Sequence, residues 1–311
     1  MRQLDTKQGA GMQQIKRLPW KWAWAIMSAI WLAICLIRPL YADDLPDIKK
    51  RGVLRHLGVP YANFVSGAGD GLDVELMQLF AQHIGVRYVY VKASWATLIS
   101  NLTGVRYKLT KDGVEITGKT AVKGDVIANG FTRLAWREQL VDFSTPTFPT
   151  QVWLVARADS PMQPIHPSED ISQDIAKVKQ LLSKRVVLGV ANTCTDPVLY
   201  CLNDVGAKPR TFQGTLNELA PAIIHGEAEA TILDVPDALV ALEKWPGSIK
   251  VIGPITPRQE MGFGFAKNAP LLRAAFNAFF EICRANGTYR RLVEKYYPSV
   301  FLFFPEFFES P

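Results

Sequence analysis

The feature that most constrains the fold of this 311-residue chain is the alternation of strand-like and helix-like segments after residue 50. A strand-like run at 53–59 leads into a glycine-rich turn at 67–71, and Asp73 then begins a segment with helical apolar spacing. A second strand-like run at 88–91 precedes a second helical segment at 95–102. The order strand, helix, strand, helix predicts a parallel sheet with crossover helices.

Composition and charge exclude two broad classes of protein. The hydrophobic content of 48% is enough for a sizeable core in one large or two moderate domains, so the chain is not disordered. The net charge of +6 is concentrated at the start, because residues 1–42 hold six Lys and Arg against one acid. The remainder carries 29 basic and 28 acidic side chains, a balance that provides no basic surface for nucleic acid.

The first 42 residues have the pattern of an export signal. A basic region ends at Lys21, an apolar run covers 22–37, and Pro39-Leu40-Tyr41-Ala42 then precedes Asp43. We expect cleavage after Ala42 and a periplasmic mature protein. An uncleaved membrane anchor is the alternative, since Arg38 ends the apolar run sharply.

Several candidate binding residues lie in one short segment at 130–144, whose sequence is GFTRLAWREQLVDFS. It contains a glycine at 130, the Thr132 hydroxyl and the Arg137 guanidinium. The planar guanidinium of an arginine matches the two oxygens of a carboxylate better than the point charge of a lysine does. For Arg137 taken alone, a solvated surface side chain is the alternative.

The spacing of Gly130, Thr132, Arg137 and the Asp-Phe-Ser at 142–144 resembles the signature of the extracellular solute-binding proteins, family 3. Members of this family are the amino-acid-capturing subunits of bacterial ABC importers. Leu134 and Trp136 replace a Thr and a Glu of the usual signature. The resemblance covers most of 48–298, with further matching segments at 71–76, 95–102, 226–230, 262–267 and 286–289.

The resemblance implies an α/β architecture, the type II periplasmic-binding-protein fold. It has two lobes, each a mostly parallel sheet flanked by helices, joined by a double crossover hinge. Lobe 1 would comprise 43–150 plus 262–311, and lobe 2 would comprise 151–261. Extended stretches with Pro and Gly at 148–155 and 251–262 agree with two crossings between lobes.

The family pattern places a ligand in the cleft between the lobes, where Arg137 would hold a carboxylate and Asp234 an ammonium group. Each charge would be costly to bury alone, so a zwitterion that supplies both counter-charges is favoured. The alternative role for Asp234 is a helix N-cap ahead of Pro236.

Aromatic side chains are expected to flank the ligand, and Tyr61, Phe64 and Trp95 match the family's stacking positions. A structural core role is the alternative for Phe64. Thr193, in a turn that begins a helix of the second lobe, would receive a carboxylate. The implied ligand-binding set is Arg137, Asp234, Thr132, Gly130, Trp95, Tyr61, Phe64 and Thr193.

Two segments depart from the family pattern. An insertion at about 105–124 contains alternating residues around Asp112-Gly113, which predicts a β-hairpin. It would either lie at the cleft mouth and alter ligand choice or form a solvent-exposed ornament. The aromatic tail at 296–308 is expected to pack on lobe 1, with a partner-docking patch as the alternative.

Cysteine and histidine usage suggests neither a local disulfide nor a metal site. Cys201 would lie on a helix beginning at 193–196 and therefore out of disulfide reach of Cys194. The four histidines are scattered, so no metal or other cofactor is predicted.

We therefore expect a monomeric periplasmic protein that binds an amino-acid-like solute and presents it to the membrane permease of an ABC importer. It would perform no catalysis and bind no nucleic acid. Two alternatives remain: an enzyme on the same fold that resembles cyclohexadienyl dehydratases, which needs a general acid in the cleft, and an accessory module that reports a ligand to a partner.

Overall fold

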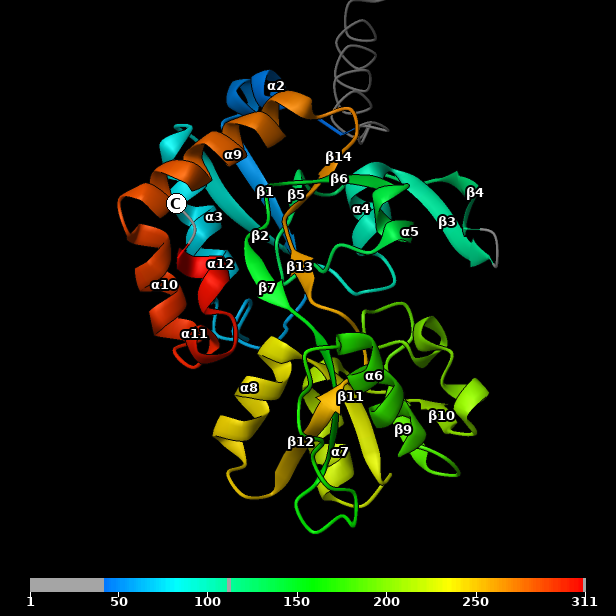
Figure 1. Cartoon of the computed structure of the whole chain (residues 1–311). Helices are drawn as coiled ribbons and strands as arrows, with labels where there is room; N and C mark the ends of the chain where they lie inside the picture. Colours follow the sequence, from blue (N-terminus) through cyan, green and yellow to red (C-terminus); the bar gives the residue numbers. More distant parts are fainter. Residues whose placement is uncertain (1–41, 111–112, 310–311) are drawn as a thin grey trace, which may run out of the picture. The chain divides into compact units, whose positions relative to one another are not determined.

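The computed structural model describes residues 42–110 and 113–309 (Figure 1). The signal peptide predicted for 1–42 lies outside the described residues except for Ala42. Of the helices in the two described ranges, none has both the length and the apolar character of a membrane span.

The first sheet has five strands in the order β2-β1-β5-β14-β6. β1 (Val53–Gly58) pairs in parallel with β2 (Arg87–Lys92) and β5 (Val126–Ile127), as the strand and helix order predicts. β14 (Gly264–Ala266) runs antiparallel between β5 and β6 (Val141–Phe143). We call the part built on this sheet the first lobe.

Helices α2 (Leu45–Arg51), α3 (Leu72–His83) and α4 (Leu98–Thr103) belong to the first lobe. The expected start of the second helical segment at Trp95 is wrong, because α4 begins three residues later. Ser94 and Thr97 form a turn instead, in which the Leu98 backbone N donates to the Ser94 carbonyl at 2.9 Å.

The second sheet has the order β10-β9-β11-β8-β12, and we call the part built on it the second lobe. β9 pairs in parallel with β10 and β11, whereas β8 is antiparallel to both of its neighbours. The strands are β8 (Val152–Arg157), β9 (Val186–Gly189), β10 (Lys208–Thr211), β11 (Ala230–Asp234) and β12 (Ile249–Pro254), and the helices are α6 (Ile171–Gln180), α7 (Leu219–Ile224) and α8 (Val235–Lys244).

Two short strands carry the chain between the sheets. β7 (Phe148–Thr150) leads from β6 to β8, β13 (Gln259–Met261) leads from β12 to β14, and the two pair antiparallel (Figure 1). This is the two-lobed fold with a double crossover that was predicted. The residue limits assigned to each lobe stay a prediction.

Strand β8 separates two apolar cores. Val152, Leu154 and Ala156 face a core confined to the second lobe, while Trp153 and Val155 face a larger core that continues into the first lobe. Side chains on alternating residues of a strand point to opposite faces, so β8 is buried on both sides. The crossing region is thus anchored by packing on each face of the second sheet.

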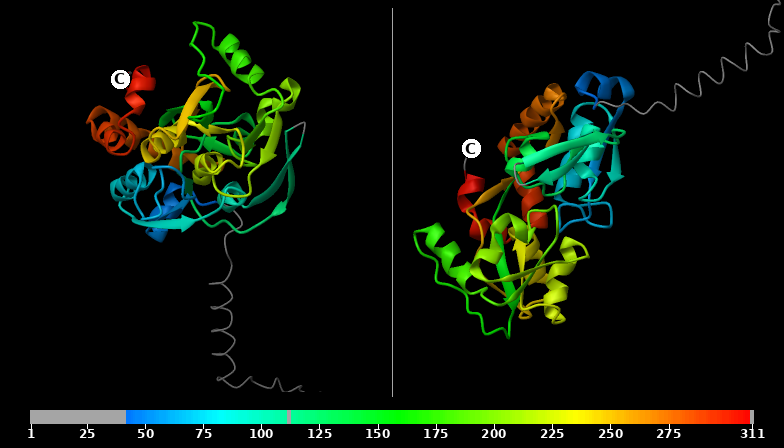
Figure 2. Two further views of the ribbon diagram at one scale, coloured as in Figure 1. Left: turned by 90° about the horizontal axis from the view of Figure 1, so that it is seen from below. Right: turned by 90° about the vertical axis from the view of Figure 1, so that its right-hand side faces the viewer.

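The inserted segment forms the predicted β-hairpin, with β3 (Val105–Thr110) antiparallel to β4 (Gly113–Lys119). It projects from the first lobe (Figures 1 and 2). The register shifts between Arg106 and Tyr107.

The C-terminal part consists of α9 (Pro270–Ala285), α10 (Thr288–Tyr296), α11 (Val300–Phe303) and α12 (Pro305–Glu309). Phe308 packs 6.2 Å from Phe148, measured between ring centroids. Phe303, however, lies 5.3 Å from the ring of Trp153 on β8. The expectation that the aromatic tail packs on the first lobe alone is therefore incomplete, because α11 also reaches the second sheet.

Candidate functional site

Arg137 lies on the short helix α5 (Ala135–Glu138), directly before β6, and is only 1% exposed. Its Nη1 donates to the Thr132 carbonyl at 2.9 Å. The guanidinium carbon lies 4.4 Å from the ring centroid of Phe131 and 5.7 Å from that of Trp95. A solvated surface arginine is thus excluded. Burial lowers the pKa of Arg137, and the neighbouring Cys194 has the opposite effect.

Asp234 is the last residue of β11 and occupies the N-cap position of α8, yet its side chain makes no capping hydrogen bond. The fully buried carboxylate instead accepts from Thr132 Oγ1 at 3.2 Å, Thr150 Oγ1 at 3.1 Å and Cys194 Sγ at 2.6 Å. Burial raises the pKa of Asp234, and the three donors and Arg137 oppose that shift. The alternative role of Asp234 as a helix N-cap therefore accounts for the position of its backbone. It does not account for the hydrogen bonds that its carboxylate makes.

Thr132 connects the two charged residues. Its carbonyl accepts from Arg137 and its hydroxyl donates to Asp234. Thr132 belongs to the first lobe, whereas Asp234 ends a strand of the second sheet. A second contact between lobes joins the Ala62 backbone N to Asn217 Oδ1 at 2.9 Å. The structure thus links Arg137 and Asp234 through Thr132 at the boundary between the two lobes.

Thr150 and Cys194 are partners of Asp234 that the sequence interpretation missed. Thr150 ends the crossing strand β7, and Cys194 lies in the turn after β9. Burial and the adjacent Asp234 raise the pKa of the Cys194 thiol, which keeps the thiol protonated as a donor. The one sequence signal for Cys194 was its position next to Thr193.

Thr193 is buried, but its hydroxyl is used inside its own turn. Thr193 Oγ1 donates to the Val190 carbonyl at 2.7 Å and lies 3.0 Å from Thr195 Oγ1. The helix expected to begin at 193–196 and include Cys201 is wrong, because two short 3-10 turns form instead, over Pro197–Tyr200 and Leu202–Val205. Asp196 caps the first turn, and Cys201 breaks it with a left-handed φ of 51°.

Tyr61 and Trp95 extend the cluster away from Arg137. Tyr61 is fully buried, and its ring meets that of Trp95 edge-on with centroids 5.7 Å apart. Trp95 also faces the Arg137 guanidinium. Tyr61, Trp95 and Arg137 therefore form a continuous row, with Trp95 in contact with the other two.

Phe64 lies in the aromatic core, with ring centroids 5.1 Å from Phe148 and 5.0 Å from Tyr297. Gly130 lies directly against it, because a Cβ at this position would be 2.3 Å from Phe64 Cδ2. The φ of +62° at Gly130 also favours glycine. These contacts give Phe64 and Gly130 structural roles in the core next to the row of Tyr61, Trp95 and Arg137.

The Gly130 backbone N donates to Asp73 Oδ2 at 2.7 Å. Asp73 is buried at the start of α3, and burial raises its pKa to about 7 in spite of this hydrogen bond. The carboxylate therefore fixes the backbone that leads into the segment of Thr132 and Arg137.

Buried polar atoms without partners gather around these residues. Buried polar groups in proteins are nearly always hydrogen-bonded, so each exception needs an explanation. Of the eight such atoms found among the described side chains, six belong to Tyr61, Asn129, Trp136, Arg137 and Asp237. Asn129, Trp136 and Asp237 lie within three residues of Thr132, Arg137 and Asp234 along the chain.

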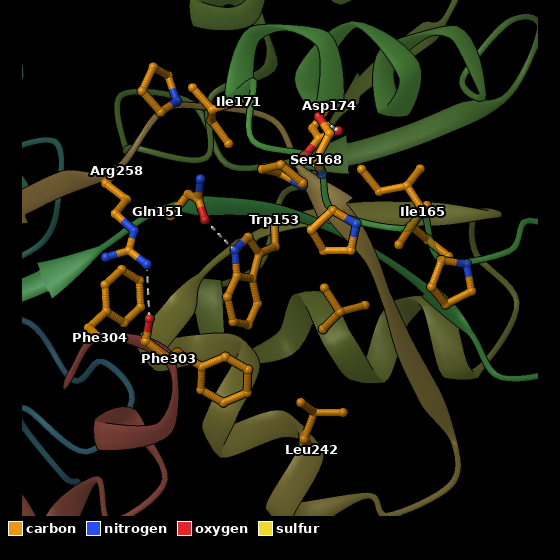
Figure 3. A pocket seen from close by; sticks show the side chains of 17 residues that line it. Gln151, Trp153, Ile165, Ser168, Ile171, Asp174, Leu242, Arg258, Phe303 and Phe304 are labelled. Carbon is orange, nitrogen blue, oxygen red and sulfur yellow. Dashed lines mark hydrogen bonds between the residues drawn. The ribbon is translucent and has the colours of Figure 1, made fainter. Parts of the chain in front are cut away.

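A separate cavity of about 880 Å³ lies between the second lobe and α11 (Figure 3). Its polar groups are already paired: Trp153 Nε1 donates to Gln151 Oε1 at 2.8 Å, and Arg258 donates to the Phe303 carbonyl at 3.2 Å. Ile165, Ile171, Leu242 and four prolines supply most of the remaining lining. Asp174 also lines the cavity, and its carboxylate accepts from the Ser168 backbone N at 2.7 Å and from the Ser168 hydroxyl at 2.8 Å.

Within 42–110 and 113–309, no cluster of three or more His, Cys, Asp or Glu side chains is arranged to hold a metal ion. Cys194, Cys201 and Cys283 are free thiols.

The two-lobed fold is that of a class of solute-binding proteins, and comparison with known sequences specifies the family. This chain belongs to the bacterial extracellular solute-binding proteins, family 3, whose model matches residues 115–299. The family predicted from the segment at 130–144 is confirmed.

Three curated relatives are similar to the chain. L-cystine-binding protein TcyJ of Escherichia coli K12 is 24% identical over 83% of this chain and 88% of its own length. Arginine-binding protein ArgT of Corynebacterium glutamicum is 27% identical over 82% and 80%, respectively. Membrane-bound lytic murein transglycosylase F of Desulfosudis oleivorans is 24% identical over 74% of this chain, which spans only 44% of that relative.

Solved structures support the fold. A P235GK mutant of ArgBP from T. maritima has a TM-score of 0.64 and 25% identity, and the match covers 82% of this chain and 99% of ArgBP. The ancestral amino-acid-binding protein AncCDT-1, described as a precursor of cyclohexadienyl dehydratase, has a TM-score of 0.61 and 24% identity over 81% and 98% of the two chains. The fold thus occurs in binding proteins and in a lineage that leads to an enzyme.

Proposed function

We propose that this protein is a periplasmic binding protein that captures an amino-acid-like zwitterion between its lobes and delivers it to an ABC permease. Residues 1–42 would be removed on export. The observation that carries the proposal is the pair of buried charges, Arg137 and Asp234, joined through Thr132 across the lobe boundary.

The ligand's carboxylate would bind Arg137, whose Nε has no hydrogen-bond partner in the described part of the chain. Its ammonium group would bind Asp234. A carboxylate has about four lone-pair sites, and Asp234 uses three of them, so one acceptor position remains for an N–H donor. A zwitterion would therefore complete both ends of the site.

Closure follows from contacts that only the closed state makes, such as the hydrogen bond from Thr132 to Asp234. A ligand that shifts an open-to-closed ratio from 1:99 to 99:1 needs about 5.5 kcal/mol of differential affinity. Two charge-assisted interactions and stacking on Trp95 and Tyr61 are sufficient for that. Phe64, Gly130 and Thr193 would support the site by packing and by local hydrogen bonds, and would not donate hydrogen bonds to the ligand.

The relatives that bind L-cystine and arginine support an amino-acid ligand. The test is native mass spectrometry of gently purified mature protein, followed by calorimetric titration of any compound that co-purifies. The proposal predicts a one-to-one complex with a small zwitterion. A co-purified compound without an ammonium or a carboxylate group would contradict it.

One observation favours a second candidate, a dehydratase-like enzyme. Asp237 is buried, its Oδ2 has no hydrogen-bond partner among the described side chains, and burial raises its pKa well above the usual range. A buried carboxyl group whose pKa is raised is suited to act as a general acid. Incubation with prephenate or arogenate tests this candidate, because turnover that is lost in Asp237→Asn would establish it.

The partner can be tested separately from the ligand. Crosslinking of the loaded protein in native membranes should capture a permease if the transport proposal is right. Capture of a receptor or enzyme without permease subunits would instead favour the accessory sensing module.

A further inference from the structure

Trp136 occupies the position where the family signature has a glutamate, directly before Arg137. The exchange replaces an anionic acceptor with an uncharged donor. The Arg137 guanidinium carbon lies 5.2 Å from the centroid of the Trp136 ring, so the two side chains are neighbours in space as well as in sequence.

Both side chains offer a buried hydrogen-bond donor with nothing to accept it. Neither Trp136 Nε1 nor Arg137 Nε has a hydrogen-bond partner in the ranges that the structure covers. A buried donor left unsatisfied costs about 1–3 kcal/mol, and an oxyanion that accepts from both donors would remove that cost. The pair therefore has the chemistry of an oxyanion site.

The inserted hairpin packs against this pair. The ring of Tyr107 on β3 lies 6.0 Å from that of Trp136, at an interplanar angle of 33°. β4 is tied to the segment after α5, because the Val114 backbone N donates to Gln139 Oε1 at 3.3 Å. The register of the hairpin shifts beside Tyr107, where Thr117 of β4 has no partner on β3. Most residues of the hairpin are solvent-exposed, but Tyr107 and Val114 connect it to Trp136 and Gln139.

We infer that the indole N–H of Trp136 is a second donor to the anionic group that Arg137 binds, and that the inserted hairpin holds this indole in place through Tyr107. The inference rests on the proposed function and adds a specificity-determining residue to it. The ligand's anionic group must then offer acceptors to both donors, as a carboxylate or a larger oxyanion does. Tyr107 is a positioning residue, since it acts through Trp136.

The test is isothermal titration of the mature protein and its variants with a fixed set of probes. The set contains the twenty L-amino acids, L-cystine, the carboxamide of each compound that binds, and inorganic sulfate and phosphate as bare oxyanions. The variants are Trp136→Phe, which keeps the ring and removes the N–H, together with Tyr107→Ala, Tyr107→Phe and Arg137→Ala.

We expect Trp136→Phe to weaken the tightest-binding oxyanion probe about 10- to 100-fold, as the loss of one hydrogen bond to a charged group does. The corresponding carboxamide should lose less than this. Tyr107→Ala should weaken the same probe about 3- to 10-fold, because the indole is no longer held, and Tyr107→Phe should restore the affinity. The Trp136 indole resonance in a ¹⁵N spectrum of the wild-type protein should move when the probe is added.

The outcomes separate the inference from the function on which it rests. Unchanged affinity in Trp136→Phe together with a large loss in Arg137→Ala would overturn the inference and leave the proposed function intact. Unchanged affinity in Arg137→Ala as well would remove the proposed site. If no probe binds, sulfate and phosphate included, both are wrong. Should Trp136→Phe fail to fold, an indole resonance that stays in place on saturation of the wild-type protein would overturn the inference.

Discussion

The interlobe cluster and the cavity beside α11 contain similar residue types and differ in how their polar atoms are satisfied. In the cavity, Trp153 and Gln151 bond to each other, and Gln151 Nε2 donates to the Thr256 carbonyl at 2.8 Å. In the cluster, Trp136 and Arg137 keep buried donors that find no acceptor among the described residues.

This difference is the reason for proposing the cluster, and not the cavity, as the site of a polar ligand. A self-satisfied polar network stabilises the fold and gains nothing from a polar ligand. An unsatisfied one costs stability until a ligand completes it. A search for a ligand site by volume would favour the cavity, whereas a search by unpaired buried polar atoms favours the interlobe cluster.

The largest expected effect comes from removing either charge of the cluster. Arg137→Ala and Asp234→Ala should each weaken amino-acid binding by about 2–5 kcal/mol, because truncation leaves the partner group buried and unpaired. Titration calorimetry on folded variants measures the loss. Wild-type affinity in both variants would show that the cluster is not the binding site and so does not differ from the cavity in this respect.

A smaller loss is expected from Thr132→Val, which removes the hydroxyl that reaches Asp234 across the lobe boundary. A hydrogen bond to a charged group contributes about 1.5–3 kcal/mol, so the affinity should fall roughly 10-fold or more. The matched control is Thr231→Val on β11, whose hydroxyl donates to the Leu188 carbonyl. The control should lower the melting temperature without affecting affinity, and an equal loss of affinity in both would contradict a specific role for Thr132.

The buried Asp73 carboxylate gives the first lobe a pH-dependent stability. Its folded pKa of about 7 exceeds the unfolded value near 3.8, so the folded state binds the extra proton between these pH values. The Asp73 contribution is therefore fully present below about pH 4 and is lost as the pH rises through 7. Asp73→Asn should melt higher than the wild type at pH 8, by a few degrees at about 2–4 °C per kcal/mol.

The advantage of Asp73→Asn should shrink at pH 5. His56, whose pKa is lowered to about 4 by burial, titrates in both proteins and cancels in the difference. Differential scanning calorimetry at the two pH values is the measurement. A difference in melting temperature that does not depend on pH would show that Asp73 ionises normally.

The smallest expected effect on binding comes from the cavity. Trp153→Phe removes the N–H that satisfies Gln151 Oε1, which should cost about 1–3 kcal/mol of folding free energy. Affinity for the amino-acid ligand should stay within about twofold, since no cluster residue is touched. A large loss of affinity would place the cavity in the binding machinery and erase the contrast between the two regions.

The local elements of the fold were predictable from sequence because their signals are local. Strand and helix periodicity predicted the parallel pairing of β1 and β2, and Asp112-Gly113 predicted the hairpin of β3 and β4. The segment at 130–144 identified Arg137 and Thr132, since a short motif preserves its spacing in any fold.

The partners of Asp234 were not predictable in the same way. Thr150 and Cys194 come from the crossing strand and from a turn of the second lobe, and only tertiary structure brings them to one carboxylate. The turn at 192–196 was mistaken for a helix start because Thr and Asp also stabilise turns. The unpaired N–H of Trp136 could not be predicted either, because sequence alone does not show which side-chain atoms are buried.

The central claim is that fixed charges from the two lobes together bind a dipolar solute. The most direct measurement is calorimetric titration of the identified amino acid beside its carboxamide and its deaminated analogue. The account predicts that each analogue binds at least about 30-fold more weakly, the lower bound for breaking one buried charge pair. Equal affinity for all three compounds would contradict it.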